Sequence, residues 1–334
     1  MTETVFLTGV SGYIGLHTAK LLLDAGYAVR GSIRNASKGQ QVRDTLNAAS
    51  VDTSNLTFVE IDLNRDAGWS DALRGADYLI HMASPFAVAN PKNEDEMIKP
   101  AVEGTLRALK SAKNAGIKRV VLTSSLLSML GSMKTGTVTP NDWTDVNAKD
   151  VSTYTKSKTL AEKAAWDFVK DQSGVEMVVI NPGAVYGPPL GNDLSGTSMG
   201  MIDQMLRGKV PMVPRLAMPM VDVRDVALLH VRALTEPEAA GQRIIASDSV
   251  PRGFADVAQI LKDEGYNGPS TRIAPNFMIR LNALFDREAK GMLGYLGMNL
   301  SADNAKTRKM FDWSPIPFKE TIVDTGRAIR AVQG

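Results

Sequence analysis

The chain has 334 residues, of which 44% are hydrophobic, and a formal net charge of +2. This composition supports a folded core and contains no polybasic or acidic run, so we expect a small-molecule partner and no nucleic acid. The absence of cysteine excludes disulfides, thiolate metal sites and cysteine nucleophiles. No apolar run reaches the roughly 20 residues that span a membrane, and the first residues lack a secretory signal, so we expect a cytoplasmic protein.

Short apolar runs alternate with longer amphipathic segments through the first half of the chain, which predicts βα units feeding a parallel sheet. The runs show little alternation, as in strands covered on both faces. The predicted strands lie near residues 3–8, 28–33, 56–61, 76–81, 118–123 and 175–180. The predicted helices span residues 13–25, 93–115 and 153–172, and Pro100 can kink the second of these.

A glycine-rich turn follows the first predicted strand and leads into the first helix. It reads Thr8-Gly9-Val10-Ser11-Gly12-Tyr13-Ile14-Gly15. Gly9 permits a sharp turn, Gly12 lets the backbone approach a pyrophosphate, and Gly15 allows close packing of helix and strand. The helix start supplies free amides and a favourable dipole, so the motif predicts a dinucleotide site, although a turn that only caps a helix is the structural alternative.

Basic residues follow the second predicted strand, where a site for NAD would usually carry an acid. Arg34 can bind a 2′-phosphate through paired charge-assisted hydrogen bonds, and Lys38 lies close enough to assist. This pattern favours NADPH over NADH, unless both are merely solvated loop charges. Asp62 and Leu63, after the third strand, are expected to flank the adenine.

Tyr154 and Lys158 lie one helical turn apart, so both side chains leave the same face of the helix predicted over residues 153–172. An ammonium beside a phenol stabilises the phenolate, and we expect it to move the pKa of Tyr154 toward neutrality. Ser125, at the end of the fifth strand, can orient a substrate carbonyl, with Ser124 in support. The serines could instead serve a local turn.

These motifs together resemble the extended short-chain dehydrogenase/reductase superfamily, in the branch of dihydroflavonol reductase, cinnamoyl-CoA reductase and related carbonyl reductases. The resemblance extends over most of the chain. Besides the glycine turn and Ser125, the segments that carry it are Arg30 to Arg34, His81 to Pro85, Tyr154 to Trp166 and Asn181 to Pro188.

The resemblance implies a Rossmann-type α/β fold, a doubly wound parallel sheet with a smaller C-terminal substrate lobe. It implies an NADP-binding domain over residues 1–185 and a substrate lobe over residues 186–334, interwoven with the first. Tyr154 would be the proton donor, Lys158 would also bind the nicotinamide ribose, and Ser125 would polarise the carbonyl. The expected cofactor contacts are Gly9, Gly12, Tyr13, Ile14, Gly15, Arg34, Lys38, Asp62, Leu63, Met82, Ala83, Ser84, Tyr154, Lys158, Pro182, Gly183, Val185 and Ser198.

Two positions depart from the relatives. Leu130 stands where plant dihydroflavonol reductases place an asparagine that binds the flavonoid, which argues against a flavonoid substrate. Ala101 stands where many members have an asparagine, so a proton relay through that side chain is absent and water reached through Lys158 would replace it.

The C-terminal half begins with a Gly/Pro loop over residues 187–193 and is then rich in methionine. Each methionine by itself is better explained by core packing, but as a group they indicate a broad apolar pocket. The methionines are Met199, Met201, Met205, Met212, Met218 and Met220, and Phe86, Met129, Tyr186 and Leu190 are further pocket candidates. Asp225 is expected to cap the helix that follows it.

The favoured function is therefore reversible, NADPH-dependent reduction of aldehyde or ketone carbonyls by a monomer or homodimer. The three histidines are too dispersed for a metal cluster, so no metal is expected. One alternative is a nucleotide-sugar epimerase or dehydratase, although such enzymes usually prefer NAD and carry a Tyr-Gly pair where this chain has Ser128 to Gly131. Another alternative is a non-enzymatic NADPH sensor, although Tyr154 and Lys158 are both present.

Overall fold

The computed structural model describes residues 2–85, 91–131, 133–149, 151–170, 174–194 and 196–333, without the side chains of residues 287 and 288. In this part of the chain the main sheet consists of β1 (Thr4–Thr8), β2 (Ala28–Ile33), β3 (Leu56–Glu60), β4 (Tyr78–His81), β5 (Arg119–Thr123), β7 (Glu176–Pro182) and β10 (Arg243–Ala246). All pair in parallel, in the order β10, β7, β5, β4, β1, β2, β3. The order reverses between β1 and β4, which confirms the predicted doubly wound sheet.

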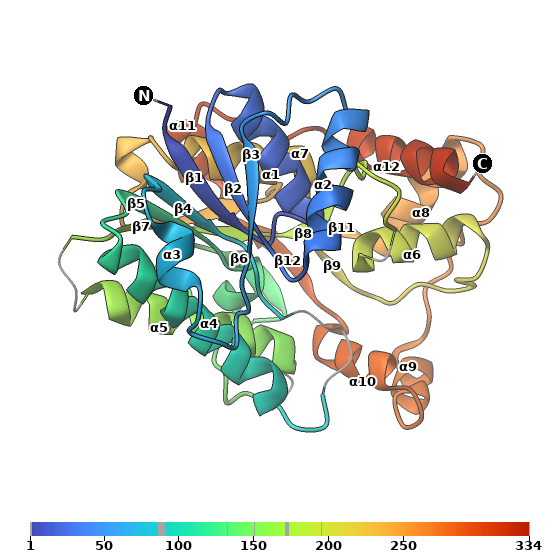
Figure 1. Ribbon diagram of the computed structural model, residues 1–334. Coiled ribbons are helices and arrows are strands. Elements are labelled where there is room, and N and C mark those ends of the chain that lie inside the picture. Colours follow the sequence, from blue (N-terminus) through green and yellow to red (C-terminus); the bar gives the residue numbers. More distant parts are fainter. Residues whose placement is uncertain are drawn as a thin grey trace.

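Helices cover both faces of this sheet (Figure 1). On one face lie α1 (Tyr13–Asp24), α2 (Ala36–Ala48) and α7 (Val223–Arg232). On the other face lie α3 (Trp69–Leu73), α4 (Asp95–Asn114) and α5 (Thr153–Lys170). The site for a ligand is therefore restricted to the edge where the strands end.

Both faces of the sheet are buried under helices, which explains why the strand sequences do not alternate between apolar and polar residues. In β1, Val5 and Leu7 pack into the core beside α1, whereas Phe6 packs into the core beside α3 and α4. The same alternation of apolar side chains between two cores continues along β4, β5 and β7. Continuous apolar runs are the sequence pattern that this environment requires.

A smaller lobe is built around a second sheet. Its strands are β6 (Thr135–Val138), β8 (Ala184–Tyr186), β9 (Ala217–Asp222), β11 (Pro251–Gly253) and β12 (Asn299–Ala302), in the order β11, β9, β12, β6 with β8 beside β9. Its helices are α6 (Thr197–Leu206), α8 (Phe254–Asp263), α9 (Asn276–Asn282), α10 (Arg287–Met292) and α12 (Phe318–Gln333). Three 3₁₀ helices, η1 (Leu126–Met129), η2 (Pro237–Ala239) and η3 (Leu293–Tyr295), and α11 (Ala305–Met310) complete the described elements.

The two lobes exchange segments of chain. The late elements α7 and β10 belong to the main sheet and its helical cover, whereas the early strand β6 pairs with β12 in the second sheet. The division at residue 185 stays a prediction.

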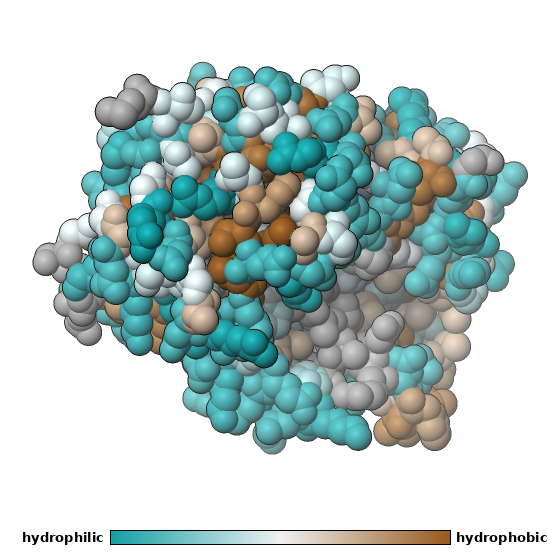
Figure 2. Space-filling model, viewed as in Figure 1, coloured by the Kyte–Doolittle hydropathy of each residue, from teal (hydrophilic) through white to brown (hydrophobic). Residues whose placement is uncertain are grey.

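In Figure 1, α9 and α10 extend below the rest of the smaller lobe. Figure 2 shows hydrophobic side chains at this position, and the exposed apolar residues of this segment include Phe277, Leu281, Leu284 and Phe285.

The six predicted strands and three predicted helices are present, with ends shifted by a few residues, and α4 runs through Pro100. The prediction missed α2, which buries only Gly39, Val42 and Leu46 and so has a weak apolar pattern. Within the described residues, no helix is long and apolar enough to cross a membrane.

The predicted cap at Asp225 is wrong. Asp222 caps α7, because its side chain accepts a hydrogen bond from the Arg224 amide. Asp225 lies inside the helix, where its buried carboxylate accepts hydrogen bonds from Trp313 Nε1 (2.9 Å) and the Ile316 amide (2.8 Å). It thereby ties α7 to the segment that leads into α12.

Replacing Asp225 with alanine should destabilise the protein, because the buried indole and amide donors would lose their acceptor. We expect a loss of about 2–4 kcal/mol in the free energy of unfolding, measured by urea denaturation. Glu238→Ala, which truncates an exposed acid on η2, is the control and should change stability by less than about 0.5 kcal/mol. Equal stability of the two variants would contradict the role given to Asp225.

Candidate active site

The glycine turn between β1 and α1 has the shape of a phosphate cradle. Gly9 adopts a φ of +75°, which other residues rarely tolerate. A Cβ on Gly15 would lie 2.1 Å from the Gly9 carbonyl oxygen, so the helix can approach the turn this closely only with glycine at that position. No described side chain caps α1, and its first turn holds no acid, so its amides are open to an anion.

Side chains from neighbouring strands hold this turn in place. Ser32 Oγ of β2 accepts a hydrogen bond from the Gly9 amide (3.1 Å). Thr8 Oγ1 accepts hydrogen bonds from the amides of Met82 (3.0 Å) and Ala83 (3.1 Å), at the end of β4. The structure thus brings the glycine turn and the segment over residues 82–84 together.

His81 is held in one tautomer by the same threonine. Thr8 Oγ1 already accepts two amide hydrogen bonds, so it donates its own proton to His81 Nδ1, 2.9 Å away. Because Nδ1 accepts this hydrogen bond, the imidazole proton lies on Nε2, which is buried and has no partner among the described residues. Burial, assisted by the Lys158 charge, lowers the pKa of His81 to about 3, so the ring is neutral.

Arg34 directly follows β2 and Lys38 lies in the first turn of α2, and both side chains are exposed. Lys38 Nζ donates a hydrogen bond to Gln41 Oε1 (2.9 Å), and Asn35 caps α2 between the two basic residues. Asp62 and Leu63 follow β3, the next strand along, where the Leu63 side chain packs against Gly104 of α4. These residues therefore follow the carboxyl ends of two neighbouring strands of the main sheet.

Tyr154, Lys158 and Ser125 come together from two elements. Tyr154 and Lys158 lie on α5, and Lys158 Nζ is 5.9 Å from the centre of the Tyr154 ring. The Ser125 side chain lies beside the Tyr154 phenol and favours its phenolate form, while Ser125 Oγ accepts a hydrogen bond from the Leu127 amide (3.2 Å). The serine turn thus presents its hydroxyl to the phenol.

Burial dominates the protonation of this group. Burial of the phenol, followed by the influence of Tyr295, raises the pKa of Tyr154, and the hydrogen bond from Ser125 opposes that rise. The direction differs from the predicted shift toward neutrality, because desolvation outweighs the stabilisation of the phenolate. Burial also lowers the pKa of Lys158 to about 8, against the opposing attraction of Glu162.

A cavity with polar walls adjoins Lys158, at the ends of β4 and β5. Its lining includes the imidazole of His81 and the side chains of Thr105, Ser124 and Glu162, besides Lys158. It has room for about one water molecule.

The segment after β7 joins the two sheets at close quarters. A Cβ on Gly183 would lie 2.4 Å from the Pro219 carbonyl oxygen, and the Gly183 amide donates to the Ala246 carbonyl (3.1 Å). Pro182 is buried at the end of β7, and Val185 is half-buried in β8. Ser198 lies half-buried in the first turn of α6.

Several predicted pocket residues are part of the core. Met129 and Tyr186 are buried, as are three of the six methionines, Met199, Met205 and Met220. Met201, Met212, Met218 and Leu190 are half-buried, and Phe86 lies outside the described residues. A second cavity is lined by Leu130, Gly131, Met133, Lys134, Thr144, Ala148, Lys149, Val151, Gly294 and Met298.

Comparison with known proteins identifies the family. The model of the NAD dependent epimerase/dehydratase family matches residues 5–246. The chain belongs to this family. Cinnamoyl-CoA reductase 2 of Arabidopsis thaliana is 35% identical to this family member over 266 residues, which cover 78% of the chain and 76% of the plant protein.

Two crystal structures resemble this family member over nearly its whole length. Gre2 from Candida albicans in complex with NADPH is 26% identical, has a TM-score of 0.80, and is matched over 99% of this chain and 100% of that one. Yeast methylglyoxal/isovaleraldehyde reductase Gre2 complexed with NADPH is 25% identical, has a TM-score of 0.79, and is matched over 99% of both chains. The comparisons confirm the predicted extended short-chain dehydrogenase/reductase membership.

Sequence reasoning missed three residues beside the site. Tyr295 of η3 approaches the Tyr154 turn, where its hydroxyl is 2.5 Å from Ser152 Oγ and 3.0 Å from Thr155 Oγ1. Glu162 and Arg243 form a buried ion pair behind the serine turn. Glu162 could have been found from its spacing, one turn beyond Lys158, whereas Tyr295 and Arg243 reach the site only through the tertiary fold.

Replacing Gly15 with alanine tests the glycine turn, because the added methyl group would collide with the Gly9 carbonyl. We expect dinucleotide binding, followed by fluorescence titration, to weaken at least about tenfold, with a loss of about 1–3 kcal/mol in stability. Gly200→Ala in α6 is the matched control, because its Cβ would meet only the Leu194 carbonyl oxygen, at 3.8 Å. Unchanged dinucleotide binding in Gly15→Ala would refute the cradle.

Proposed function

We propose that this chain is an NADPH-dependent reductase that converts small, largely apolar aldehydes or ketones into alcohols, reversibly. The observation that carries the proposal is the convergence of Ser125 and Tyr154 from two elements, with Lys158 one helical turn along α5. The relatives named above support it, because they include a cinnamoyl-CoA reductase and two Gre2 structures with NADPH. Both Gre2 matches extend over almost the entire chain.

In this mechanism the protein supplies a proton and a hydrogen bond to the carbonyl oxygen. NADPH, when bound, supplies hydride to the carbonyl carbon. Tyr154 Oη donates its proton to the oxygen, and Ser125 Oγ–H orients it. The raised pKa of Tyr154 keeps the phenol protonated until the substrate oxygen develops charge, and the Lys158 ammonium stabilises the phenolate that remains.

The residues present fit the cofactor at both ends. The open amides of α1, which glycine at position 15 allows to lie close to the turn, suit a pyrophosphate. The exposed guanidinium of Arg34 suits a 2′-phosphate, with Lys38 in support. At the catalytic end, the His81 Nε2–H group and the Lys158 amine can both donate hydrogen bonds to the cofactor. The remaining proposed contacts are Gly9, Gly12, Tyr13, Ile14, Asp62, Leu63, Met82, Ala83, Ser84, Pro182, Gly183, Val185 and Ser198.

We propose that the substrate enters the cavity whose lining includes Leu130, Met133 and Met298. Thr144 adds a polar group to this wall. Of the other lining residues, Val151 lies shortly before Tyr154 in the sequence and Gly294 directly before Tyr295. The leucine and methionine side chains of this wall suit a small aliphatic or aromatic carbonyl, and Lys134 and Lys149 are its charged members. This argument, together with the reductase relatives, favours carbonyl reduction over the epimerase alternative.

Water in the cavity beside Lys158 replaces the side-chain relay that is missing at Ala101. Thr105, one turn along α4 from Ala101, lines this cavity together with Lys158. The non-enzymatic alternative gains no support, because Ser125, Tyr154 and Lys158 are all together. The cytoplasmic location and the monomeric or homodimeric state stay predictions.

Tyr154→Phe tests the proposed chemistry on a panel of aliphatic and aromatic aldehydes, ketones and diketones, followed by NADPH absorbance. Because the variant lacks the proton donor, kcat should fall by about 10²–10⁴-fold while NADPH binding is retained. Lys20→Ala on the exposed end of α1 is the control and should behave as the wild type. Wild-type turnover in Tyr154→Phe, or no turnover of any panel member by the wild type, would refute the proposal.

Arg34→Ala tests the choice of cofactor. Losing the guanidinium should weaken the apparent affinity for NADPH about 10–100-fold and leave that for NADH within about threefold, because only NADPH carries the 2′-phosphate. The measurement is the KM for each cofactor at saturating carbonyl. Arg308→Ala removes an exposed base on α11, outside the proposed cofactor site, and serves as the control. An equal effect on both cofactors would contradict the role of Arg34.

A further inference from the structure

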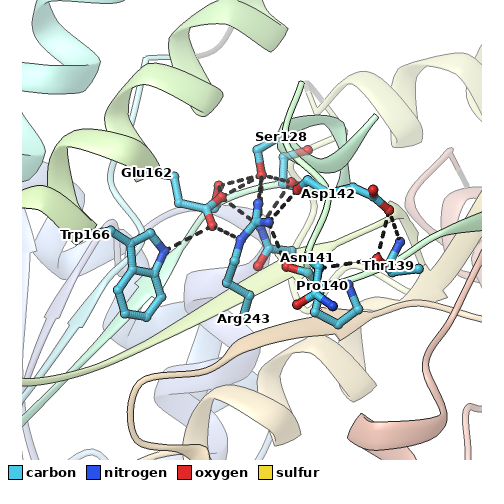
Figure 3. Close-up of polar contacts among 11 residues, drawn as sticks. Ser128, Thr139, Pro140, Asn141, Asp142, Glu162, Trp166 and Arg243 are labelled. Atoms are coloured by element: carbon cyan, nitrogen blue, oxygen red, sulfur yellow. Dashed lines mark hydrogen bonds and ion pairs between the residues drawn. The ribbon is translucent and has the colours of Figure 1, made fainter. Parts of the chain in front are cut away.

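Glu162 is a buried acid on the same face of α5 as the proposed catalytic pair. Tyr154, Lys158 and Glu162 follow one another at intervals of four residues, one helical turn each. The Glu162 side chain is buried, and Figure 3 shows its carboxylate among polar groups from several elements. The proposed mechanism gives this carboxylate no part, although it lines the cavity beside Lys158.

One carboxylate oxygen binds the serine turn. Glu162 Oε2 is 2.5 Å from Ser124 Oγ, 2.5 Å from Ser128 Oγ and 2.9 Å from Asn181 Nδ2. Ser124 and Ser128 lie on either side of Ser125, and Asn181 Nδ2 also reaches the Ser125 carbonyl oxygen, at 3.2 Å. The carboxylate therefore fixes the backbone that presents the Ser125 hydroxyl to Tyr154.

The other carboxylate oxygen is held by a buried guanidinium. Glu162 Oε1 accepts a hydrogen bond from Arg243 Nε (2.6 Å) and another from Trp166 Nε1 (3.4 Å). Arg243 Nη1 donates to the carbonyl oxygens of Pro140 (2.8 Å) and Asp142 (2.6 Å), as Figure 3 shows. These hydrogen bonds satisfy polar groups that burial would otherwise leave without partners.

Well-packed apolar side chains of the same volume often stabilise a fold as much as a buried ion pair does. Its place between the serine turn and Lys158 therefore points to a role in the reaction. We propose that Glu162 is a positioning residue, which holds the Ser125 turn against α5 and presents a fixed negative charge to Lys158. This inference rests on the catalytic roles proposed above for Ser125, Tyr154 and Lys158.

The other groups around Lys158 do not supply that charge. Tyr154 on α5 and His81 on β4 are neutral, α4 contributes Thr105, and Tyr295 of η3 faces Tyr154. Arg243 of β10 binds the far oxygen of Glu162. Glu162 raises the pKa of Lys158 against burial, so removing its charge should make the ammonium lose its proton at lower pH.

Glu162→Gln keeps the size of the side chain and removes its charge. We expect kcat to fall about 10–100-fold with the KM for NADPH within about threefold, because the serine turn shifts while the cofactor cradle stays intact. The basic limb of the kcat profile should move down by about one pH unit, as the Lys158 ammonium loses its anion. Asp167→Asn makes the same charge change at an exposed position of α5 and should leave both quantities unchanged.

Glu162→Gln leaves Arg243 without its anion and can impair folding, so the double variant Glu162→Gln/Arg243→Met, which removes both charges, is measured beside it. A folded variant, checked by circular dichroism, with reduced kcat and a shifted basic limb supports the proposal. A folded variant with an unmoved basic limb overturns it, whether kcat falls or not. Tyr154→Phe distinguishes a failure of this inference from a failure of the proposed function, since wild-type activity in that variant refutes the proposed function itself.

Discussion

The hydroxyl of Thr8 links the end of β1 to the segment that follows β4, where the strand order of the main sheet reverses. The helix after β1 covers one face and the helix after β4 covers the other, so the two chain segments diverge beyond the strand ends. The amides of Met82 and Ala83 would then lack strand partners, and Thr8 Oγ1 accepts hydrogen bonds from both. The glycine turn, His81 and the segment that borders the catalytic end consequently share one rigid connection.

Burial sets the protonation states of the side chains at the catalytic end. It favours the neutral forms of Tyr154, His81 and Lys158, and only Lys158 has a buried carboxylate beside it to oppose the effect. The phenol therefore retains its proton at rest, the imidazole remains a hydrogen-bond donor, and the amine stays close to its point of titration. Such an arrangement suits a proton donor that acts only when charge develops on a substrate oxygen.

The sequence was sufficient wherever the determining pattern is local. Apolar runs located six strands of the main sheet but not β10 or the second sheet, and the glycine turn and the Tyr154–Lys158 spacing depend on residues close together in the chain. Arg243 and Tyr295 could not be found in this way, because each reaches the site from a distant segment. The sign of the Tyr154 pKa shift also depends on burial, which the sequence does not reveal, and the cap of α7 could be assigned to Asp222 only once the start of that helix was known.

Gly183 determines how the two lobes are fitted together. The chain passes directly from the main sheet into the second one at this residue, and the Pro219 carbonyl occupies the space that a side chain would need. Any other residue would force β8 and β9 apart, and with them the walls between which a substrate must fit. Exchanging substrate lobes between relatives to obtain new specificities would therefore require glycine at this junction, even though it contacts neither the serine turn nor the ion pair.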